Sequence, residues 1–246
     1  MELRFRLLQA RDSNDSARQE EHEAFADFLQ LPLHQVDSFD LLSEEVTAER
    51  MMAGVDAILV GGSGAYGVND DVPWMRDYID GLGAVAEHGF PMFASCFGFQ
   101  GLCMALGAEV KPDSEGAEVG TYEIQVTEAG SEDPLFRHLP SQFMAQQGHK
   151  DRALALPSDC TWLARSERCP YQAIRYRDKL IYATQFHPEL DGEAQSSRFR
   201  NYFELYKGVY GETRAREILE EICPSPEANG LLLHFKDLLL AQRTQS

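Results

Sequence analysis

The first half of the chain alternates between short apolar runs and longer amphipathic stretches. Four strands are expected, over residues 3–10, 33–39, 56–60 and 90–95. Apolar residues at helical spacing predict three helices, over residues 15–31, 72–89 and 98–108. This alternation of strand and helix predicts an α/β fold with an open, mostly parallel central sheet and helices on both faces.

The second half changes its pattern at Glu118. Strand-like segments then follow in close succession, over residues 118–130, 141–156, 161–167 and 171–187. We expect them to extend the central sheet as extra antiparallel strands. The last fifth of the chain has helical patterning, over residues 193–211, 212–223 and 227–245, and Pro224 and Pro226 separate the last two helices.

No repeat or linker divides the chain, so one domain over residues 1–246 is expected. Its core extends to about residue 208, and residues 209–246 form a helical extension. The last helix carries one apolar stripe, made of Leu231, Leu232, Phe235, Leu238 and Leu239. Such a stripe favours packing onto the domain, and an interface with a partner or a second copy is the alternative.

Composition narrows the function classes. The chain has 246 residues, of which 43% are hydrophobic, and a formal charge of −18. So acidic a protein repels phosphate backbones and anionic lipids, which argues against nucleic acid and membrane surfaces as partners. Five cysteines with no C-x-x-C pair argue against a disulfide framework or a structural zinc site. No signal peptide or membrane-spanning run is apparent, so a cytoplasmic location is expected.

The stretch "PMFASCFGFQGL", residues 91–102, places Cys96 between a buried strand and a helix. A turn there lifts the sulfur out of the sheet, and the helix N-terminus favours the thiolate. The N–H of the next residue can stabilise an oxyanion. The pattern small-x-Cys-x-Gly resembles the nucleophile elbow of hydrolases. A buried structural thiol is the alternative, and the local pattern alone leaves the two readings balanced.

A base for such a nucleophile is expected at His187. It ends the strand-like run "LIYATQFHPEL", and Pro188 terminates the strand directly after it. A side chain at the carboxyl end of a strand points into the crevice where open α/β sheets bind ligands. Glu189 is placed to orient the imidazole and to stabilise its charged form. A strand-ending turn with a solvated glutamate is the alternative.

Together these residues resemble the class I glutamine amidotransferases of the triad type. The likeness covers residues 56–189: the glycine loop "ILVGGSGAYGVND", then "SCFGFQ", "QGHKDRALALPSDCTWLARSE" and "CPYQAIRYRDKLIYATQFHPE", in the order of the family. The resemblance implies that Cys96 is the nucleophile, that His187 is the general base and then the general acid, and that Glu189 orients His187.

The resemblance also implies roles around this triad. The amides of Gly62 and Phe97 would form the oxyanion hole. Gln100, Gly148 and His149 would bind the γ-glutamyl substrate, the last two through the backbone. No metal or organic cofactor is required, and the sequence offers no site for one.

The sequence departs from the family pattern at three places. Ala94 stands where the elbow usually begins with glycine, which would be strained if that position needed a positive φ. Phe99 replaces the usual histidine, and an apolar side chain there is expected to pack rather than to touch substrate. The glycine loop lacks the usual proline, which points to a longer or more mobile loop and leaves open which of its amides is the oxyanion donor.

Three alternatives for the function of the chain remain open. The chain could be a glutaminase that supplies ammonia to a separate synthase partner, because no Walker-type motif or synthase segment is present. It could instead be a γ-glutamyl peptidase or hydrolase, since stand-alone relatives of the GMP synthase amidotransferase domain include such enzymes. A catalytically silent, partner-binding relative is the third alternative, and the intact Cys96, His187 and Glu189 argue against it.

Overall fold

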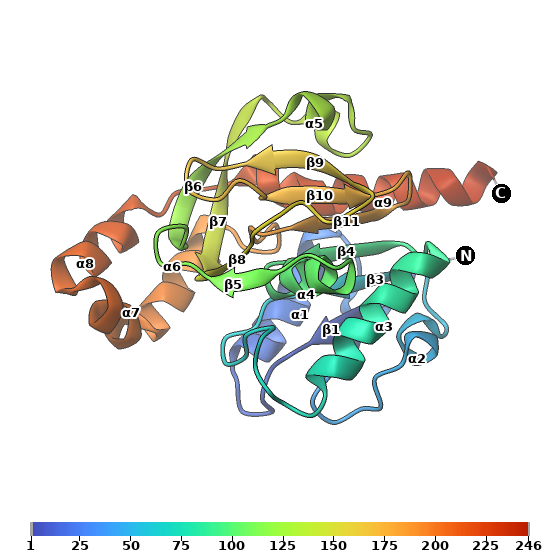
Figure 1. The fold of residues 1–246 in the computed structure, drawn as a ribbon, viewed down its shortest axis with the longest axis horizontal. Coiled ribbons are helices and arrows are strands. Elements are labelled where there is room, and N and C mark those ends of the chain that lie inside the picture. Colours follow the sequence, from blue (N-terminus) through green and yellow to red (C-terminus); the bar gives the residue numbers. More distant parts are fainter. Residues whose placement is uncertain (1, 246) are drawn as a thin grey trace.

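A nine-stranded sheet organises the molecule in the computed structural model, which describes residues 2–245 (Figure 1). The strand order is β2-β1-β3-β4-β11-β10-β9-β6-β7. Its first five strands run parallel: β1 (Phe5–Gln9), β2 (Val36–Asp40), β3 (Ala57–Val60), β4 (Met92–Ser95) and β11 (Ile181–Thr184). The predicted fold class is confirmed.

The antiparallel strands continue the same sheet, as expected. They are β10 (Ala173–Tyr176), β9 (Cys160–Arg165), β6 (Glu118–Val126) and β7 (Gln142–His149). A short two-stranded sheet, β5 (Val110–Pro112) with β8 (Asp151–Ala153), lies beside them. The parallel half and the antiparallel half join at β11, the strand that leads to His187.

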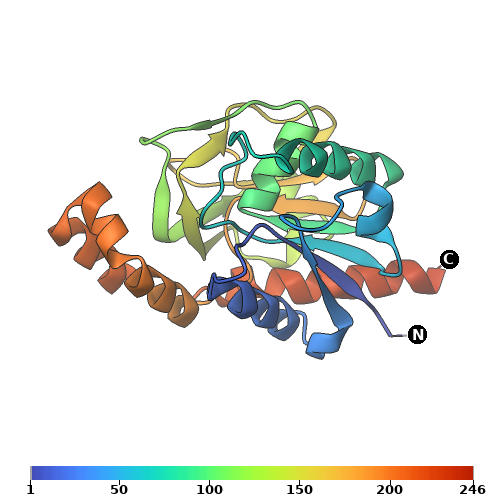
Figure 2. The same ribbon diagram turned by 90° about the horizontal axis from the view of Figure 1, so that it is seen from below.

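Helices cover both faces of the sheet (Figures 1 and 2). Three helices pack on one face: α2 (Ala48–Met52), α3 (Met75–His88) and α4 (Phe97–Ala105). Two helices pack on the other face: α1 (Ala17–Phe28) and α9 (Pro226–Gln245). Before α1, Asp15 accepts a hydrogen bond from the Ala17 N–H at 2.9 Å, and Gly89 closes α3 with φ 67°.

The predicted helix over residues 193–211 is instead two helices, α6 (Gly192–Asn201) and α7 (Phe203–Tyr210), with the break at Tyr202. With α8 (Glu212–Glu221) they form an arm beside the sheet (Figure 2). The break allows the helices of the arm to pack around a small apolar cluster, made of Val119, Phe199, Ala215 and Ile218. The sequence pattern also missed α2 and the short α5 (Glu128–Glu132).

The apolar stripe of the last helix packs onto the domain, as expected. Leu231, Leu232, Phe235 and Leu239 are buried in the same cluster as the strands, and Leu238 is partly buried against it. Residues of the expected extension therefore contribute to the core. Within residues 2–245, no helix is both long enough and apolar enough to cross a bilayer.

Candidate active site

The predicted triad lies at the carboxyl ends of adjacent parallel strands. Cys96 directly follows β4, and His187 comes shortly after β11, which pairs with β4 along its length. The glycine loop follows β3, the neighbour of β4 on the other side. Because parallel strands end at one edge of the sheet, segments far apart in sequence meet there.

Cys96 sits on a strained turn between β4 and α4. Its φ of 50° and ψ of −101° are unusual for a residue with a side chain, and strain of this kind occurs mainly at functional sites. Close packing holds the turn: the Gly98 N–H donates to the Gly61 carbonyl at 3.2 Å. A Cβ on Gly98 would lie 2.7 Å from the Val60 Cβ, so only glycine fits.

His187 and Glu189 form a buried pair. The imidazole Nδ1 lies 2.6 Å from the Glu189 Oε1. Burial by itself would lower the pKa of His187, but the charges of Cys96 and Glu189 and hydrogen bonds to both raise it to about 10. Burial would raise the pKa of Glu189, and the neighbouring imidazolium outweighs this and lowers it. The ring is therefore protonated at neutral pH and faces Cys96.

Two glycines flank the imidazole. A Cβ on Gly62 would lie 2.8 Å from the His187 Cε1, and one on Gly148 would lie 3.6 Å from the Nε2. The backbone of the glycine loop thus contacts one part of the ring, and β7 contacts another. The His187 N–H also donates to the Gln146 carbonyl at 2.9 Å, which fixes the backbone of the histidine to β7.

The Gly62 amide, predicted as an oxyanion donor, is engaged elsewhere. It donates to the Glu21 Oε1 at 3.0 Å. Glu21 is fully buried and also accepts from Arg11 at 2.9 Å and from Gln9 at 3.0 Å. A Cβ on Gly61 would lie 2.5 Å from the same carboxylate. The carboxylate of Glu21 on α1 therefore fixes the position of the glycine loop through its contacts with Gly61 and Gly62.

Phe97, the other predicted oxyanion donor, is the first residue of α4. The first N–H groups of a helix have no carbonyl partner within it. Among residues 2–245 no acceptor is found for this N–H. The amide therefore stands next to the sulfur of Cys96, at the positive end of the helix dipole.

The predicted substrate-binding residues meet the catalytic ones in one cavity of about 450 Å³. Its lining includes Cys96, Phe97 and His187 together with Gln100, Gly148 and His149. The Gln100 Nε2 donates to the Asp151 carbonyl at 2.9 Å, which fixes the amide and ties α4 to the start of β8.

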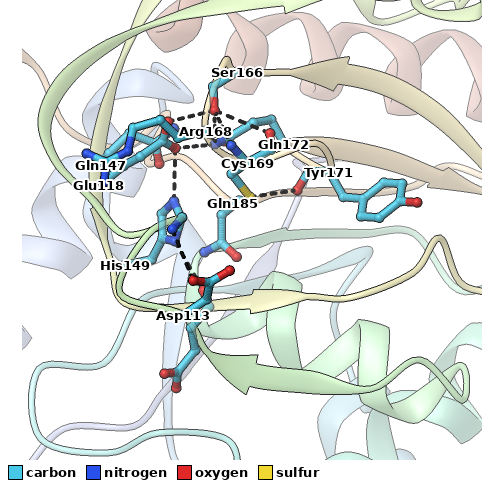
Figure 3. A network of polar contacts seen from close by, with 12 residues as sticks. Asp113, Glu118, Gln147, His149, Ser166, Arg168, Cys169, Tyr171, Gln172 and Gln185 are labelled. Atoms are coloured by element: carbon cyan, nitrogen blue, oxygen red, sulfur yellow. Dashed lines mark hydrogen bonds and ion pairs between the residues drawn. The ribbon is translucent and has the colours of Figure 1, made fainter.

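A buried polar network supports the segment around His149 (Figure 3). The Nε2 of His149 lies 3.1 Å from the Glu118 carboxylate, and its Nδ1 lies 3.1 Å from the Asp151 carbonyl. Ser166 donates to the other oxygen of Glu118 at 2.6 Å, and Gln172 donates to the first. Both ring nitrogens of His149 are therefore engaged within the protein and are not free to bind a ligand.

Two of the departures from the family pattern have a structural outcome. Ala94 lies in regular strand geometry, paired with Ala183 and Val60, and the positive φ falls on Cys96 instead. Alanine at position 94 is therefore unstrained. Phe99 is fully buried in the core, which confirms that it packs rather than lines the cavity.

Sequence reasoning missed Arg11, Glu21, Asp151 and the aromatic side chains of α6 and α7. Glu21 had a signal, since it shares the buried face of α1 with Ala17 and Phe25 at four-residue spacing. Asp151 lines the cavity with one carboxylate oxygen buried and unpaired, and burial raises its pKa. Over the described part of the chain, no group of three His, Cys, Asp or Glu side chains is arranged to hold a metal.

Comparison with protein families gives a match to the family described as glutamine amidotransferase class-I, over residues 19–204. A glutamine-hydrolysing GMP synthase from Thermosipho africanus is 36% identical over 134 residues, which are 54% of this chain and 24% of the relative. This chain therefore spans about a quarter of that relative's length. A separate glutamine-hydrolysing GMP synthase subunit from Thermoplasma acidophilum is 31% identical over 155 residues, 61% of this chain and 71% of the relative.

Solved structures share the fold over nearly the whole chain. A glutamine amidotransferase from Thermotoga maritima superposes with a TM-score of 0.71 at 22% identity, covering 99% of both chains. A Thermoplasma acidophilum protein described as a GMP synthase subunit superposes with a TM-score of 0.67 at 19% identity, covering 99% of this chain and 98% of the other.

Proposed function

Because the chain belongs to the class I glutamine amidotransferase family, we propose that Cys96, His187 and Glu189 hydrolyse the γ-carboxamide of glutamine. The observation that carries the proposal is the strained turn that presents Cys96 to a buried, protonated His187. The imidazolium and the N-terminus of α4 both stabilise negative charge on the sulfur. Glu189 fixes the ring orientation by its 2.6 Å contact with Nδ1.

In the first half of the reaction, the Cys96 sulfur forms a bond to the γ-carbonyl carbon. The C–N bond then breaks, and the leaving nitrogen takes a proton from His187 and departs as ammonia. In the second half, water attacks the thioester and gives one proton to His187. The C–S bond breaks and glutamate leaves. One water is consumed, and the triad returns to its starting state.

We assign the Phe97 N–H as one oxyanion donor, because it lies next to Cys96 and lacks another acceptor. The Gly62 N–H is the second donor that the family resemblance implies. Since it donates to Glu21 here, it reaches a substrate oxygen only if its peptide turns away from that carboxylate. The unpaired oxygen of Asp151 is placed to receive the substrate's α-ammonium group.

Labelling tests the nucleophile. A diazo-ketone analogue of glutamine should add once per chain, at Cys96, and Cys96→Ser should abolish both labelling and glutamate release. Cys103 is the internal control, because it is fully buried in the core. Adduct formation at Cys103 with Cys96 unmodified would refute the assignment.

When glutamine is the substrate, a synthase partner is proposed as the acceptor of the ammonia, on the strength of the Thermoplasma acidophilum relative that is a separate subunit of a GMP synthase. Glutaminase activity should then rise when the cognate synthase is added. His187→Ala should remove turnover in both cases while leaving the circular dichroism spectrum unchanged.

A further inference from the structure

One wall of the cavity around Cys96 is apolar and aromatic, and binding of glutamine does not explain such a lining. Beyond Cys96 and His187, the cavity is lined by apolar and aromatic side chains of the arm, among them Phe199, Leu205, Tyr206 and Val209. Leu205 is 62% exposed and Val209 is 66% exposed. These two are the most exposed large apolar side chains of the described chain, and they lie at the mouth of the site.

The aromatic part of this wall lines the same cavity as the proposed nucleophile, Cys96. The Tyr206 ring stacks on Phe199 with ring centroids 4.4 Å apart. Tyr202 extends this wall as far as the glycine loop, because its hydroxyl would lie 3.6 Å from a Cβ placed on Gly64.

Arg198, on the same wall, is a cation without a hydrogen-bonded partner. It lines the cavity, and its buried Nε has no acceptor. No hydrogen bond or ion pair within 4.0 Å of this guanidinium is found among residues 2–245. Its charge helps to lower the pKa of Glu189 without forming an ion pair, so the guanidinium is suited to hydrogen-bond an anionic group of a ligand.

We propose that this wall is a leaving-group subsite, and that the preferred substrates are γ-glutamyl amino acids whose second residue is aromatic or large and aliphatic. The side chain of that residue lies against Leu205, Tyr206 and Val209, and its carboxylate faces Arg198. The inference rests on the proposed acyl transfer at Cys96 and names its substrate class. Ammonia, the leaving group of glutamine, has neither an apolar body nor a carboxylate to use these contacts.

The chemistry is the same as for glutamine, with a different leaving nitrogen. Cys96 forms the thioester, the γ-amide C–N bond breaks, and His187 protonates the nitrogen so that the amino acid departs. Water then cleaves the C–S bond and releases glutamate. The products are two amino acids, and one water is consumed.

A substrate comparison tests the subsite. We would measure kcat/KM for γ-glutamyl-phenylalanine, γ-glutamyl-glycine, γ-glutamyl-phenethylamide and glutamine. Contacts with an apolar side chain change such ratios by about tenfold or more, so γ-glutamyl-phenylalanine should exceed glutamine and γ-glutamyl-glycine by at least about tenfold. The phenethylamide lacks the carboxylate and should fall between them. Equal or better turnover of glutamine would overturn the proposal.

Variants locate the effect. Leu205→Ser combined with Val209→Ser should lower the ratio of γ-glutamyl-phenylalanine to glutamine by about tenfold. Leu240→Ser, at an exposed leucine of α9 far from the cavity lining, is the matched control and should leave the ratio unchanged. Arg198→Gln should raise KM for γ-glutamyl-phenylalanine and erase its advantage over the phenethylamide. A loss of equal size for all four substrates would assign Arg198 to the glutamyl part and refute the subsite.

The two proposals fail in different ways. If Cys96 is labelled and glutamine is hydrolysed, but the substrate ratios ignore the wall variants, only the leaving-group subsite is wrong. If Cys96 is not labelled and no γ-glutamyl compound is cleaved, the proposed function itself is wrong.

Discussion

His187 is the residue at which the electrostatics of the site are concentrated. Its pKa is raised from 6.5 to about 10, so the folded state binds this proton more tightly than the unfolded state does. The stabilisation is present in full below about pH 6.5 and is lost as the pH rises through about 10. The difference in free energy of unfolding between wild type and His187→Gln should therefore shrink over this range.

Urea denaturation at several pH values measures that difference. His88→Gln is the control, because His88 is exposed and only bonds a carbonyl of its own helix. Between pH 6.5 and 10, the difference from wild type should change more for His187→Gln than for His88→Gln. Equal changes for the two variants would mean that the folded protein does not hold the His187 proton.

Gly62 tests how closely the glycine loop is fitted to the histidine. The Cβ of Gly62→Ala would lie 2.8 Å from the His187 Cε1, so the ring or the loop must move. A displacement of about 1 Å at a catalytic group costs about 10²-fold in kcat. We expect a loss of that size in glutaminase assays. Gly83→Ala on α3, whose Cβ meets nothing nearer than 3.7 Å, should keep full activity.

Which site residues could be predicted from the sequence depended on whether a local sequence pattern marks them. The positions of Cys96, His187 and Glu189 at the ends of apolar strand patterns could be predicted, because parallel strands end at one edge of a sheet. The local pattern left a buried thiol as an equal alternative for Cys96, and the expected roles of all three residues came from the family resemblance. The contact of Glu21 with Gly62 could not be predicted. It joins residues 41 apart and depends on how α1 lies across the ends of β1 and β3. Even so, a glutamate on the apolar face of a helix was a visible anomaly.

At the scale of elements, Glu21 joins α1 to the glycine loop by accepting a hydrogen bond from the Gly62 N–H, and an ion pair with Arg11 neutralises its charge. Both side chains are buried, 3% and 0% exposed. Removing one partner of a buried pair leaves an uncompensated charge and costs about 3 kcal/mol or more. Glu21→Ala should therefore lower the free energy of unfolding by about that amount, measured by urea denaturation, and should also free the loop and reduce kcat.

Two variants make this prediction specific. Asp37→Ala removes a 31% exposed carboxylate on β2 and its ion pairs with Arg4, 53% exposed, and Arg6, 16% exposed, and it should cost about 1 kcal/mol or less. The double variant Arg11→Met/Glu21→Leu replaces the buried pair by apolar groups and should recover most of the lost stability, but not the activity. Equal destabilisation by Asp37→Ala and Glu21→Ala would contradict the role of burial.

The elements that sequence patterning predicted best have a uniform environment along their length. The strands β1 to β4 and the helix α3 were expected within a few residues, because their apolar spacing reflects that environment. The single run expected over residues 171–187 is instead two strands, β10 and β11, of which β11 joins the parallel half. The arm was mispredicted as a continuous helix over residues 193–211. Its apolar residues face two environments, the small cluster around Phe199 and the open cavity, and a single helical period cannot describe both.

At the scale of the whole molecule, the C-terminal helix packs against the N-terminal part of the chain. The last helix α9 packs beside α1 on one face of the sheet, so the two ends of the sequence cover the same strands (Figure 2). Below them lie β4 and β11, the strands that carry Cys96 and lead to His187. The stability of the active-site edge is thus tied to the C-terminal helix, which no catalytic residue occupies.

Phe235 on α9 tests that connection. Its ring is fully buried and meets Phe93 of β4 edge to face at 5.5 Å and Tyr182 of β11 at 6.4 Å. Phe235→Ala should lower the free energy of unfolding by about 3–5 kcal/mol, because the cavity opens against both strands. Leu240→Ala, at a 42% exposed position on the same helix, should cost less than about 1 kcal/mol. If Phe235→Ala is no more destabilising than Leu240→Ala in urea denaturation, α9 is not part of the cooperative core. The catalytic domain would then be expected to fold and turn over without this helix.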